Sequence, residues 1–159
     1  MAGYQVDVVT TFPIQPNRRR HRPRLLSKEY LNGIRVFRVA ALIPKGPGIW
    51  RKFLFYASFT FTSLIALPLV RQAKFVLGLD PPAPFLMVPG FLFSRIFGAK
   101  YIIRVTDLWP DVVFDFDLAR PRLLKGLVRA VSKMAYRLND GIMAFTPRIR
   151  QRLLEFGIP

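Results

Sequence analysis

The sequence has no cysteine, one histidine and few acidic residues, and each of these shortages excludes a kind of chemistry. The lack of cysteine excludes a disulfide scaffold, a cysteine zinc site and a thiol nucleophile. Because His21 is the only imidazole, a histidine-based metal site is disfavoured. The only glutamates, Glu29 and Glu155, lie far apart in the sequence and offer no local glutamate pair for acid–base catalysis.

Two sequence signals are also absent. No Gly-x-Gly-x-x-Gly or P-loop motif occurs, so the sequence does not support a self-contained dinucleotide or ATP site. Polar and apolar residues alternate among the first ten residues, which include Asp7. This is not the pattern of a signal peptide. We therefore expect a cytoplasmic protein, and the lack of cysteine permits that compartment.

Basic and apolar residues are abundant. There are 25 Lys and Arg against 9 Asp and Glu, which gives a formal net charge of +16. Hydrophobic residues make up 52% of the 159 residues, which suits one folded domain rather than a disordered tail. A charge of this size predicts an anionic partner, which could be nucleic acid, a phosphorylated ligand or an anionic membrane surface.

Short β-branched or alternating runs predict strands, and longer periodic runs predict helices. The predicted strands are Val6–Thr10, Ile34–Val39, Lys74–Leu79, Tyr101–Thr106 and Ile142–Phe145. The predicted helices are Pro84–Phe97, Arg122–Leu138 and a last one that Thr146 caps and Gly157 ends. Strands that alternate with helices predict an α/β fold, a Rossmann-like parallel sheet with helices on both faces.

Three of these elements carry a prediction about burial. Lys74–Leu79 is expected to be a buried strand, whereas Ile34–Val39 alternates and is expected to keep one face in solvent. In Arg122–Leu138 an apolar stripe lies opposite a basic face. The stripe consists of Leu123, Leu124, Leu127, Val128, Val131, Met134 and Ala135, and the basic face of Lys125, Arg129, Lys133 and Arg137.

The carboxyl ends of the predicted strands form the candidate binding edge, because ligands of parallel α/β sheets bind there. The residues at these ends are Thr11, Asp80, Asp107 and Thr146. Asp107 could accept a hydrogen bond from a substrate hydroxyl, and the ring of Trp109 could stack on a sugar or a lipid. The alternative, which spacing alone favours, is that Asp107 caps the next turn and Trp109 belongs to the core.

Six short motifs, in one order along nearly the whole chain, resemble the N-terminal domain of family 4 glycosyltransferases of the colanic-acid and O-antigen type. The motifs are Val6–Pro13, Asn32–Val39, Asp80-Pro81-Pro82, Phe97–Tyr101, Thr106-Asp107-Leu108-Trp109-Pro110 and Phe145–Leu153, with Gly157-Ile158-Pro159 at the end. Among them, the Asp-Leu-Trp-Pro match is the most specific.

The resemblance implies a GT-B fold, in which two Rossmann-like domains face each other across a cleft. The N-terminal domain of such enzymes usually holds the acceptor, often a lipid-linked sugar, and the C-terminal domain binds the nucleotide-sugar donor. Transfer usually proceeds with retention and needs no bound metal or other cofactor. By this resemblance Asp107 is the catalytic residue, a carboxylate at the strand end that faces the cleft. The resemblance also implies that the substrate is bound by Thr11, Asp80, Trp109 and Thr146.

The sequence also departs from the family. Relatives begin with a further strand and a glycine-rich loop, and they continue into a donor domain whose hallmark glutamate pair has no counterpart here. Arg104-Val105-Thr106 stands where relatives often have Glu-Val-Arg, Asp111 replaces a usual Glu, and Asp80 stands where Ser is common. The resemblance therefore predicts that residues 1–159 are a single acceptor-side domain without its first strand and without the donor domain.

These departures leave alternatives to a working enzyme. The chain could be the acceptor subunit of a split transferase or a non-catalytic fragment, and we expect no transfer by the chain alone. We also expect poor solubility, because a sheet without its first central strand exposes an edge.

Residues Phe53–Val70 carry no charge, and Trp50, Arg51 and Lys52 precede them. A transmembrane helix needs about 20 apolar residues, so this stretch stands at the lower limit for a span. Its serines and threonines and Pro68 dilute its apolar character. We expect a helix that packs on the sheet or dips into a membrane interface, with a true span as the alternative.

A basic run of five arginines offers a site for phosphates. It consists of Arg18, Arg19, Arg20, Arg22 and Arg24. We expect it to bind an anionic membrane surface at the inner face of the cell membrane, where each cation contributes about 1 kcal/mol. A solvated loop and nucleic-acid binding are the alternatives, and the second ranks last because no nucleic-acid module is recognisable. Asp115 and Asp117 match a metal-binding Asp-x-Asp motif, but no third ligand is evident, so no metal is expected.

Overall fold

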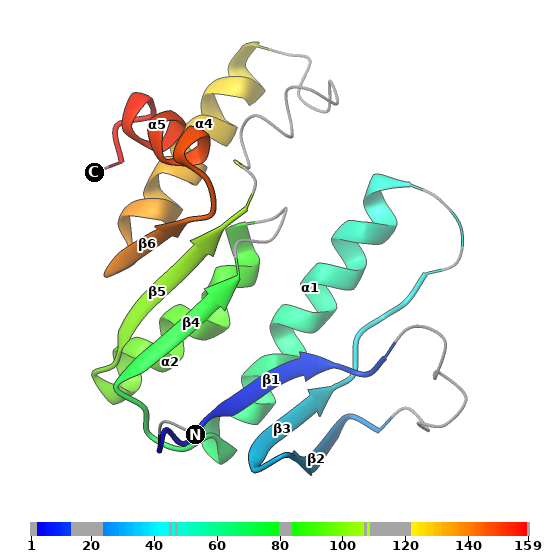
Figure 1. The fold of residues 1–159 in the computed structure, drawn as a ribbon. Coiled ribbons are helices and arrows are strands. Elements are labelled where there is room, and N and C mark those ends of the chain that lie inside the picture. The colour runs from blue at the N-terminus through cyan, green and yellow to red at the C-terminus, as the bar shows by residue number, and fades with distance from the viewer. Residues whose placement is uncertain are drawn as a thin grey trace. The chain divides into compact units, whose positions relative to one another are not determined.

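The computed structural model describes residues 3–13, 24–44, 46, 48–79, 84–106, 108 and 122–158. The sequence predicts one domain, and the structure divides into two compact units, Met1–Arg71 and Gln72–Pro159, each of which we describe by itself. The α/β class predicted from the sequence is confirmed, because strands and helices alternate along the chain (Figure 1).

The first unit is a three-stranded sheet with one long helix packed on it. The strands are β1 (Asp7–Thr11), β2 (Leu26–Leu31) and β3 (Ile34–Val39). Their order is β1-β3-β2, with β1 parallel and β2 antiparallel to β3. Helix α1 (Ile49–Ala66), continued by a short 3₁₀ helix at Leu67–Leu69, places Ala66 against Phe37 and Val39 to form the core.

Strand β2 was not predicted from the sequence. Its residues, Leu-Ser-Lys-Glu-Tyr-Leu, lack a clean alternation, but a turn at Asn32-Gly33 joins it to β3 as a hairpin. Both turn residues have positive φ, 50° at Asn32 and 83° at Gly33, which glycine and asparagine tolerate best. The turn residues therefore determine this hairpin more than the pattern of β2 does.

The prediction of a solvent-exposed face on β3 is wrong. Val36, Phe37 and Val39 are buried, and so is Arg35. Arg35 is paired with Asp7 on β1 and Arg38 with Glu29 on β2, so both cations are neutralised within the sheet. Buried charges persist when they are paired in this way.

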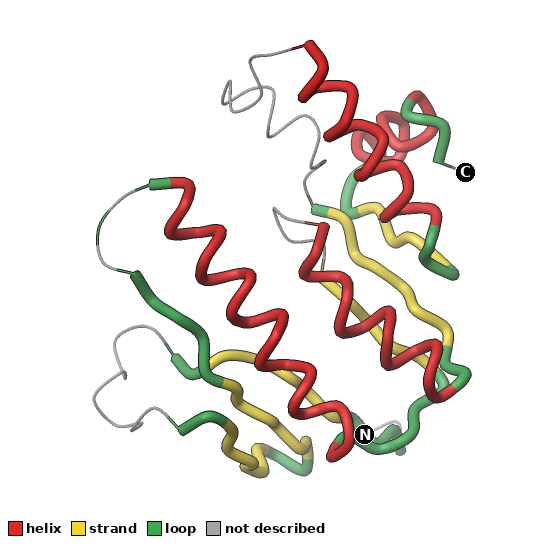
Figure 2. The backbone as a smooth tube through the Cα atoms, turned by 180° about the vertical axis from the view of Figure 1, so that it is seen from behind, coloured by secondary structure: helices red, strands yellow, loops and turns green. Residues whose placement is uncertain are grey.

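The second unit contains an all-parallel sheet, in the order β4-β5-β6. Its strands are β4 (Phe75–Leu79), β5 (Lys100–Val105) and β6 (Gly141–Ala144). Its helices are a 3₁₀ helix at Pro84–Met87, α2 (Val88–Phe97), α4 (Arg122–Arg137) and α5 (Pro147–Glu155). Figure 2 shows the helices as red coils beside the yellow strands. Parallel strands joined by helices are compatible with a Rossmann-like fold.

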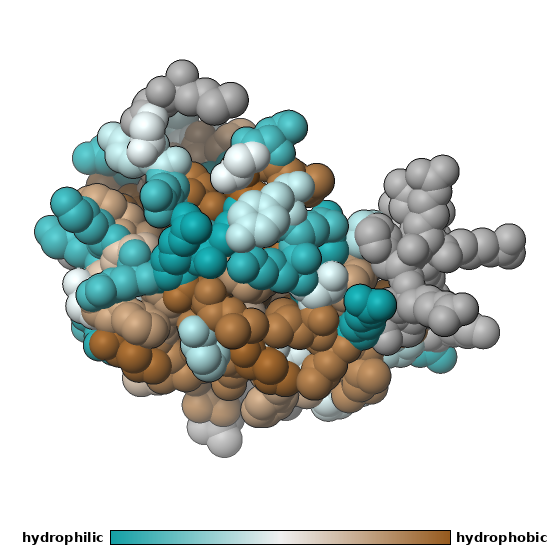
Figure 3. Space-filling view, turned by 90° about the horizontal axis from the view of Figure 1, so that it is seen from below, coloured by the Kyte–Doolittle hydropathy of each residue, from teal (hydrophilic) through white to brown (hydrophobic). Residues whose placement is uncertain are grey.

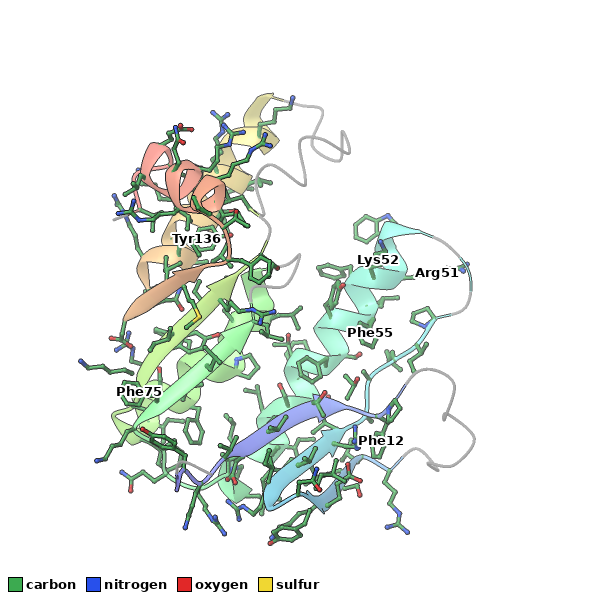
Figure 4. All side chains as sticks on the ribbon, viewed as in Figure 1. Phe12, Arg51, Lys52, Phe55, Phe75 and Tyr136 are labelled. Atoms are coloured by element: carbon green, nitrogen blue, oxygen red, sulfur yellow. The ribbon has the colours of Figure 1, made fainter. Side chains whose placement is uncertain are left out.

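The core of the second unit lies on one face of this sheet. Tyr101, Ile103 and Val105 point from β5 to this face and pack in one cluster with Tyr136 of α4 and Leu153 of α5. Tyr136 is labelled in Figure 4. Alternate residues of a strand share a face, so all three strand residues lie on the side that the helices cover, and all three are at most 2% exposed.

The prediction that Lys74–Leu79 is a buried strand is wrong. Phe75, Leu77 and Leu79 of β4 are 62–64% exposed and alternate with Val76, which packs against the core. β4 is an edge strand of its sheet, and the described helices whose side chains join the core pack on the other face. The run is apolar enough for a buried strand, but these three side chains lie on the face that the described core-forming helices do not cover.

Helix α4 also buries a different side from the apolar stripe found in the sequence. Ser132 and Tyr136 are buried, whereas Leu127, Val131 and Met134 of the stripe are exposed. The hydroxyl of Ser132 donates to the carbonyl oxygen of Val128 at 2.7 Å, which allows a polar residue to face the core. The contact side of α4 thus lies between its apolar stripe and its basic face.

Candidate functional site

The carboxyl ends of β4, β5 and β6 meet at one edge of the second sheet, because the three strands are parallel. Thr106 directly follows β5, the central strand, and Thr146 follows β6 after one residue. The backbone N–H of Phe145 donates to the carbonyl oxygen of Val105 at 3.0 Å, which extends the pairing of β5 and β6 to this edge. The structure therefore brings the Thr106 and Thr146 segments to the same end of the sheet.

Three of the predicted site residues, Asp80, Asp107 and Trp109, lie outside the described residues. Both neighbours of Asp107 are described. Thr106 is half-buried at the end of β5, and Leu108 is 8% exposed and belongs to the core cluster. The segment that carries the Asp-Leu-Trp-Pro motif thus starts at the carboxyl end of the central strand.

Thr146 has a structural role that the sequence predicted. Its side-chain oxygen accepts a hydrogen bond from the backbone N–H of Ile149 at 3.2 Å and so caps α5, with Pro147 at the first helical position. This bond uses part of the hydrogen-bonding capacity of the hydroxyl, whose own hydrogen can still be donated.

Replacing this cap gives a first testable prediction. Thr146→Ala is expected to lower the free energy of unfolding by about 1 kcal/mol, because it leaves an N–H group of the first turn without its acceptor. Urea unfolding followed by circular dichroism measures the loss. Thr146→Ser keeps the oxygen and serves as the control. Equal losses in the two variants would show that the methyl group, not the cap, stabilises this end of α5.

Thr11 is the end residue of β1 and belongs to the first unit. Its carbonyl oxygen accepts a hydrogen bond from Nη1 of Arg38 at 3.3 Å, while Nε of Arg38 donates to the carboxylate of Glu29. The side chain of Thr11 is half-buried. At this end of the first sheet, Thr11 therefore lies beside Arg38, whose charge is paired with Glu29.

Of the five arginines in the basic run, Arg24 is described and exposed. Arg18, Arg19, Arg20 and Arg22 lie outside the described residues, as do Asp115 and Asp117 of the Asp-x-Asp motif. Among the described residues, no group of three or more His, Cys, Asp or Glu could hold a metal ion.

The sequence analysis missed the most strongly perturbed acid of the first unit. Asp7 accepts a hydrogen bond from Nε of Arg35 at 2.8 Å and a second from its Nη2, and the backbone N–H of Arg71 donates to Oδ2 at 2.9 Å. The Arg35 guanidinium, more than any other group, holds the pKa of Asp7 below its ordinary value. A charged residue in a run that otherwise reads as a buried strand was the available signal, since a buried acid needs a cation.

Asp140 is the corresponding acid of the second unit. Its Oδ2 accepts a hydrogen bond from the backbone N–H of Tyr101 at 2.8 Å, and its own N–H donates to the carbonyl oxygen of Tyr101 at 2.9 Å. The first of these bonds lowers the pKa of Asp140, with a smaller effect from Arg95. Each acid lies at the amino end of a strand of its own sheet, whereas ligands of parallel sheets bind at the carboxyl ends, so a structural role follows for both.

Apolar residues cover broad areas of the surface, as Figure 3 shows from below. Trp50–Leu69 is long and apolar enough to cross a membrane by length and composition. Only 17% of that stretch is buried, whereas the core helix of a soluble protein would be mostly buried. The end of α1 packs on the first sheet, since Ala66 lies in the core of the first unit.

No model of a protein family matches this sequence, and a search of curated proteins finds no match.

Proposed function

We propose that this chain is the acceptor-binding half of a GT-B glycosyltransferase of the family 4 type. In this proposal the complete enzyme transfers a sugar from a nucleotide-sugar to a lipid-linked glycan acceptor during synthesis of cell-surface polysaccharide. The observation that supports the proposal is that β5, the central strand of a parallel sheet, ends at Val105, two residues before the Asp-Leu-Trp-Pro motif begins in the sequence. Ligands of such sheets bind at this end.

Each residue of the proposed site has a role that its chemistry allows. The carboxylate of Asp107 accepts a hydrogen bond from the acceptor hydroxyl and orients it for transfer. The ring of Trp109 stacks on the acceptor sugar or its lipid. Asp80 and Thr146 are the proposed hydrogen-bonding groups of the second unit, and the proposal assigns no metal or other cofactor.

The proposal assigns the nucleotide-sugar to a donor domain outside these 159 residues. Transfer needs the donor held in attack geometry against the acceptor hydroxyl, which an acceptor domain cannot provide alone. The purified chain is therefore expected to bind acceptor without transferring sugar. Turnover by the chain alone, with any nucleotide-sugar, would contradict this part of the proposal.

The proposal also places the protein peripherally at the cytoplasmic face of the membrane. The net charge of +16 favours an anionic surface, and the basic run from Arg18 to Arg24 is the proposed contact with lipid phosphates. A lipid-linked acceptor is embedded in that surface, so attachment brings the site to its substrate. Nucleic-acid binding remains the less favoured alternative, since the cations are spread over several elements.

Acceptor binding by an Asp107 variant tests the proposal. The probe is a polyprenyl-diphosphate-linked monosaccharide in detergent, with the same lipid diphosphate without sugar as a reference. We expect the chain to bind the sugar-linked lipid more tightly, and Asp107→Asn to weaken that binding by about tenfold, since a hydrogen bond to a charged group contributes about 1.5–3 kcal/mol.

The matched control is Glu155→Gln, which removes an exposed carboxylate near the end of α5. We expect it to bind both lipids as the unaltered chain does. Equal affinity for the two lipids, or binding by Asp107→Asn that matches the control, would refute the proposed acceptor site.

A further inference from the structure

Helix α1 exposes apolar residues to solvent and keeps polar residues on its less exposed sides. A helix in water normally has the opposite arrangement. Every exposed residue between Phe53 and Leu69 is apolar. These residues are Phe53, Leu54, Phe61, Ile65, Pro68 and Leu69. Phe61, near the middle of the helix, is 70% exposed, and Trp50 at its start is 74% exposed. A surface helix of a soluble protein normally carries charged or polar residues on this side.

The hydroxyl groups of α1 lie on its less exposed sides instead. Thr60 is 7% exposed and Ser63 2%, and their hydroxyls donate to the helix's own carbonyl oxygens at 3.0 and 2.8 Å. The hydroxyl of Thr62 donates to the carbonyl oxygen of Ala40 at 2.6 Å, and the hydroxyl of Ser58 accepts from the N–H of Leu42 at 2.8 Å. Hydrogen bonds thus satisfy these polar groups inside the protein and leave the apolar residues outside.

The charges near α1 show what covers this outer face. Arg51 and Lys52 are exposed in its first turn, next to Trp50, and no charged residue follows until Arg71 (Figure 4). Tryptophan beside cations is the pattern of a helix end at a membrane surface. A second copy of a chain with a net charge of +16 would be repelled, and a protein partner would need a polar rim that this face lacks.

We propose that α1 lies in the plane of an anionic bilayer, with its outer face inserted among the lipids and Arg51 and Lys52 at the phosphates. An apolar helix face enters about 5–10 Å into the headgroup and acyl boundary in such an arrangement. The inference rests on the peripheral attachment proposed above, and it assigns the contact to α1 rather than to the basic run alone.

The packing of α1 excludes a span across the bilayer. Ser58 accepts a hydrogen bond from Leu42, which follows β3, and Ala66 packs against the sheet. A span would therefore draw the first unit into the hydrocarbon. That unit carries the Asp7–Arg35 pair and open strand edges, which hydrocarbon does not tolerate. A helix that is partly covered by protein can only present its free side to lipid.

Depth measurements with single tryptophans test the proposal. In a Trp109→Phe background, Trp50 is the only indole, and adding Trp50→Phe with Phe61→Trp moves the probe to mid-helix. The vesicles contain phosphatidylcholine and phosphatidylglycerol, with quenchers on shallow or deep positions of the lipid. We expect both probes to shift their emission to the blue and to be quenched equally well by the shallow label. Stronger deep quenching at position 61 than at 50 would indicate a span and overturn the proposal.

Partitioning of serine variants gives an independent readout. Phe61→Ser with Ile65→Ser is expected to weaken vesicle binding by about 30-fold, because two apolar side chains no longer leave water. Melting of this variant in solution should be unchanged or improved, since both side chains are already exposed. The matched control is Leu127→Ser with Met134→Ser, which alters two exposed apolar residues of α4 and should bind as before.

The outcomes separate this inference from the proposed membrane attachment. If the protein binds vesicles but both probes stay in water, or the α4 control loses as much binding as the α1 variant, α1 is not the contact and only this inference fails. If no variant binds anionic vesicles even at low salt, both proposals fail.

Discussion

Asp7→Ala is expected to lower the free energy of unfolding by about 3 kcal/mol, because it leaves the buried guanidinium of Arg35 without its counter-ion. The side chains of Asp7 and Arg35 are 8% and 10% exposed, so water replaces little of the lost interaction. The variant also removes the acceptor for the N–H of Arg71, which ties the end of the first unit to β1. Urea unfolding at pH 7, followed by circular dichroism, measures the effect.

The same ion pair predicts a loss of stability in acid. The pKa of Asp7 is lowered in the folded state by Arg35 and is about 3.9 when unfolded. Its contribution is therefore fully present above the unfolded pKa and is lost as the pH falls through the folded one. Asp7→Asn should reduce the fall in stability between pH 5 and pH 3, leaving the part that comes from Asp140.

The control for these variants is the second ion pair of the same sheet. Glu29→Gln removes the partner of Arg38, whose side chain is 17% exposed, while that of Glu29 is 29% exposed. A pair this open to water contributes about 1 kcal/mol or less. Losses of equal size in Asp7→Ala and Glu29→Gln would show that burial does not strengthen the Asp7–Arg35 pair.

A second large effect is expected where the ring of Tyr101 lies against two glycines. A Cβ at Gly90 of α2 would lie 2.7 Å from Cε2 of Tyr101, and one at Gly78 of β4 would lie 2.4 Å from its Oη. Because Tyr101 is 2% exposed and packed in the core, its ring has no free space to enter. Gly90→Ala should therefore lower the free energy of unfolding by about 1–3 kcal/mol.

Gly126→Ala is the matched control within a helix. Gly126 of α4 is exposed, and a Cβ there would meet no atom within 4 Å. Alanine restricts the unfolded chain and favours the helix, so this variant should gain about 0.5–1 kcal/mol. The two helical glycines are thus expected to respond with opposite signs in the same thermal or urea unfolding experiment. A gain in stability for Gly90→Ala would show that Tyr101 can move.

Local signals in the sequence were sufficient where a residue acts on its own neighbours. Thr146 with Pro147 predicted the start of α5, and Gly98, whose φ is 65°, predicted the end of α2. The β-branched run before Thr106 predicted β5, the central strand of its sheet. Caps, turns and strand propensity depend on a few adjacent residues, so the sequence shows them directly.

Predictions failed where the outcome depends on distant partners. β3 was expected to keep one face in solvent because its residues alternate, but Asp7, 28 residues before Arg35, neutralises Arg35 inside the sheet. Leu77 was expected to be buried because its run is apolar, but the described helices that join the core pack on the opposite face of the sheet. The stripe of α4 was visible in the sequence, yet packing through Ser132 and Tyr136 decided which side faces the core.

The candidate site was predicted only in part. The sequence placed Thr146 after one strand and ended another at Thr106, and the structure brings the Thr106 and Thr146 segments to one edge of one sheet. The reversed polarity of α1 could not be read from residues 53–70, because the uncharged run does not show which side the sheet covers. Only the contacts of Thr62 and Ala66 identify the inner side and leave Phe61 outside.

The division of the chain has a consequence for its synthesis. Each unit is one unbroken stretch, so the ribosome translates all of Met1–Arg71 before it begins Gln72–Pro159. The hydrogen bond from Arg71 to Asp7 joins the last residue of the first unit to its first strand. Since N-terminal units fold first during translation, the nascent first unit can close as soon as Arg71 leaves the exit tunnel. The bond between Arg71 and Asp7 can therefore form only when the whole of the first unit is outside the tunnel.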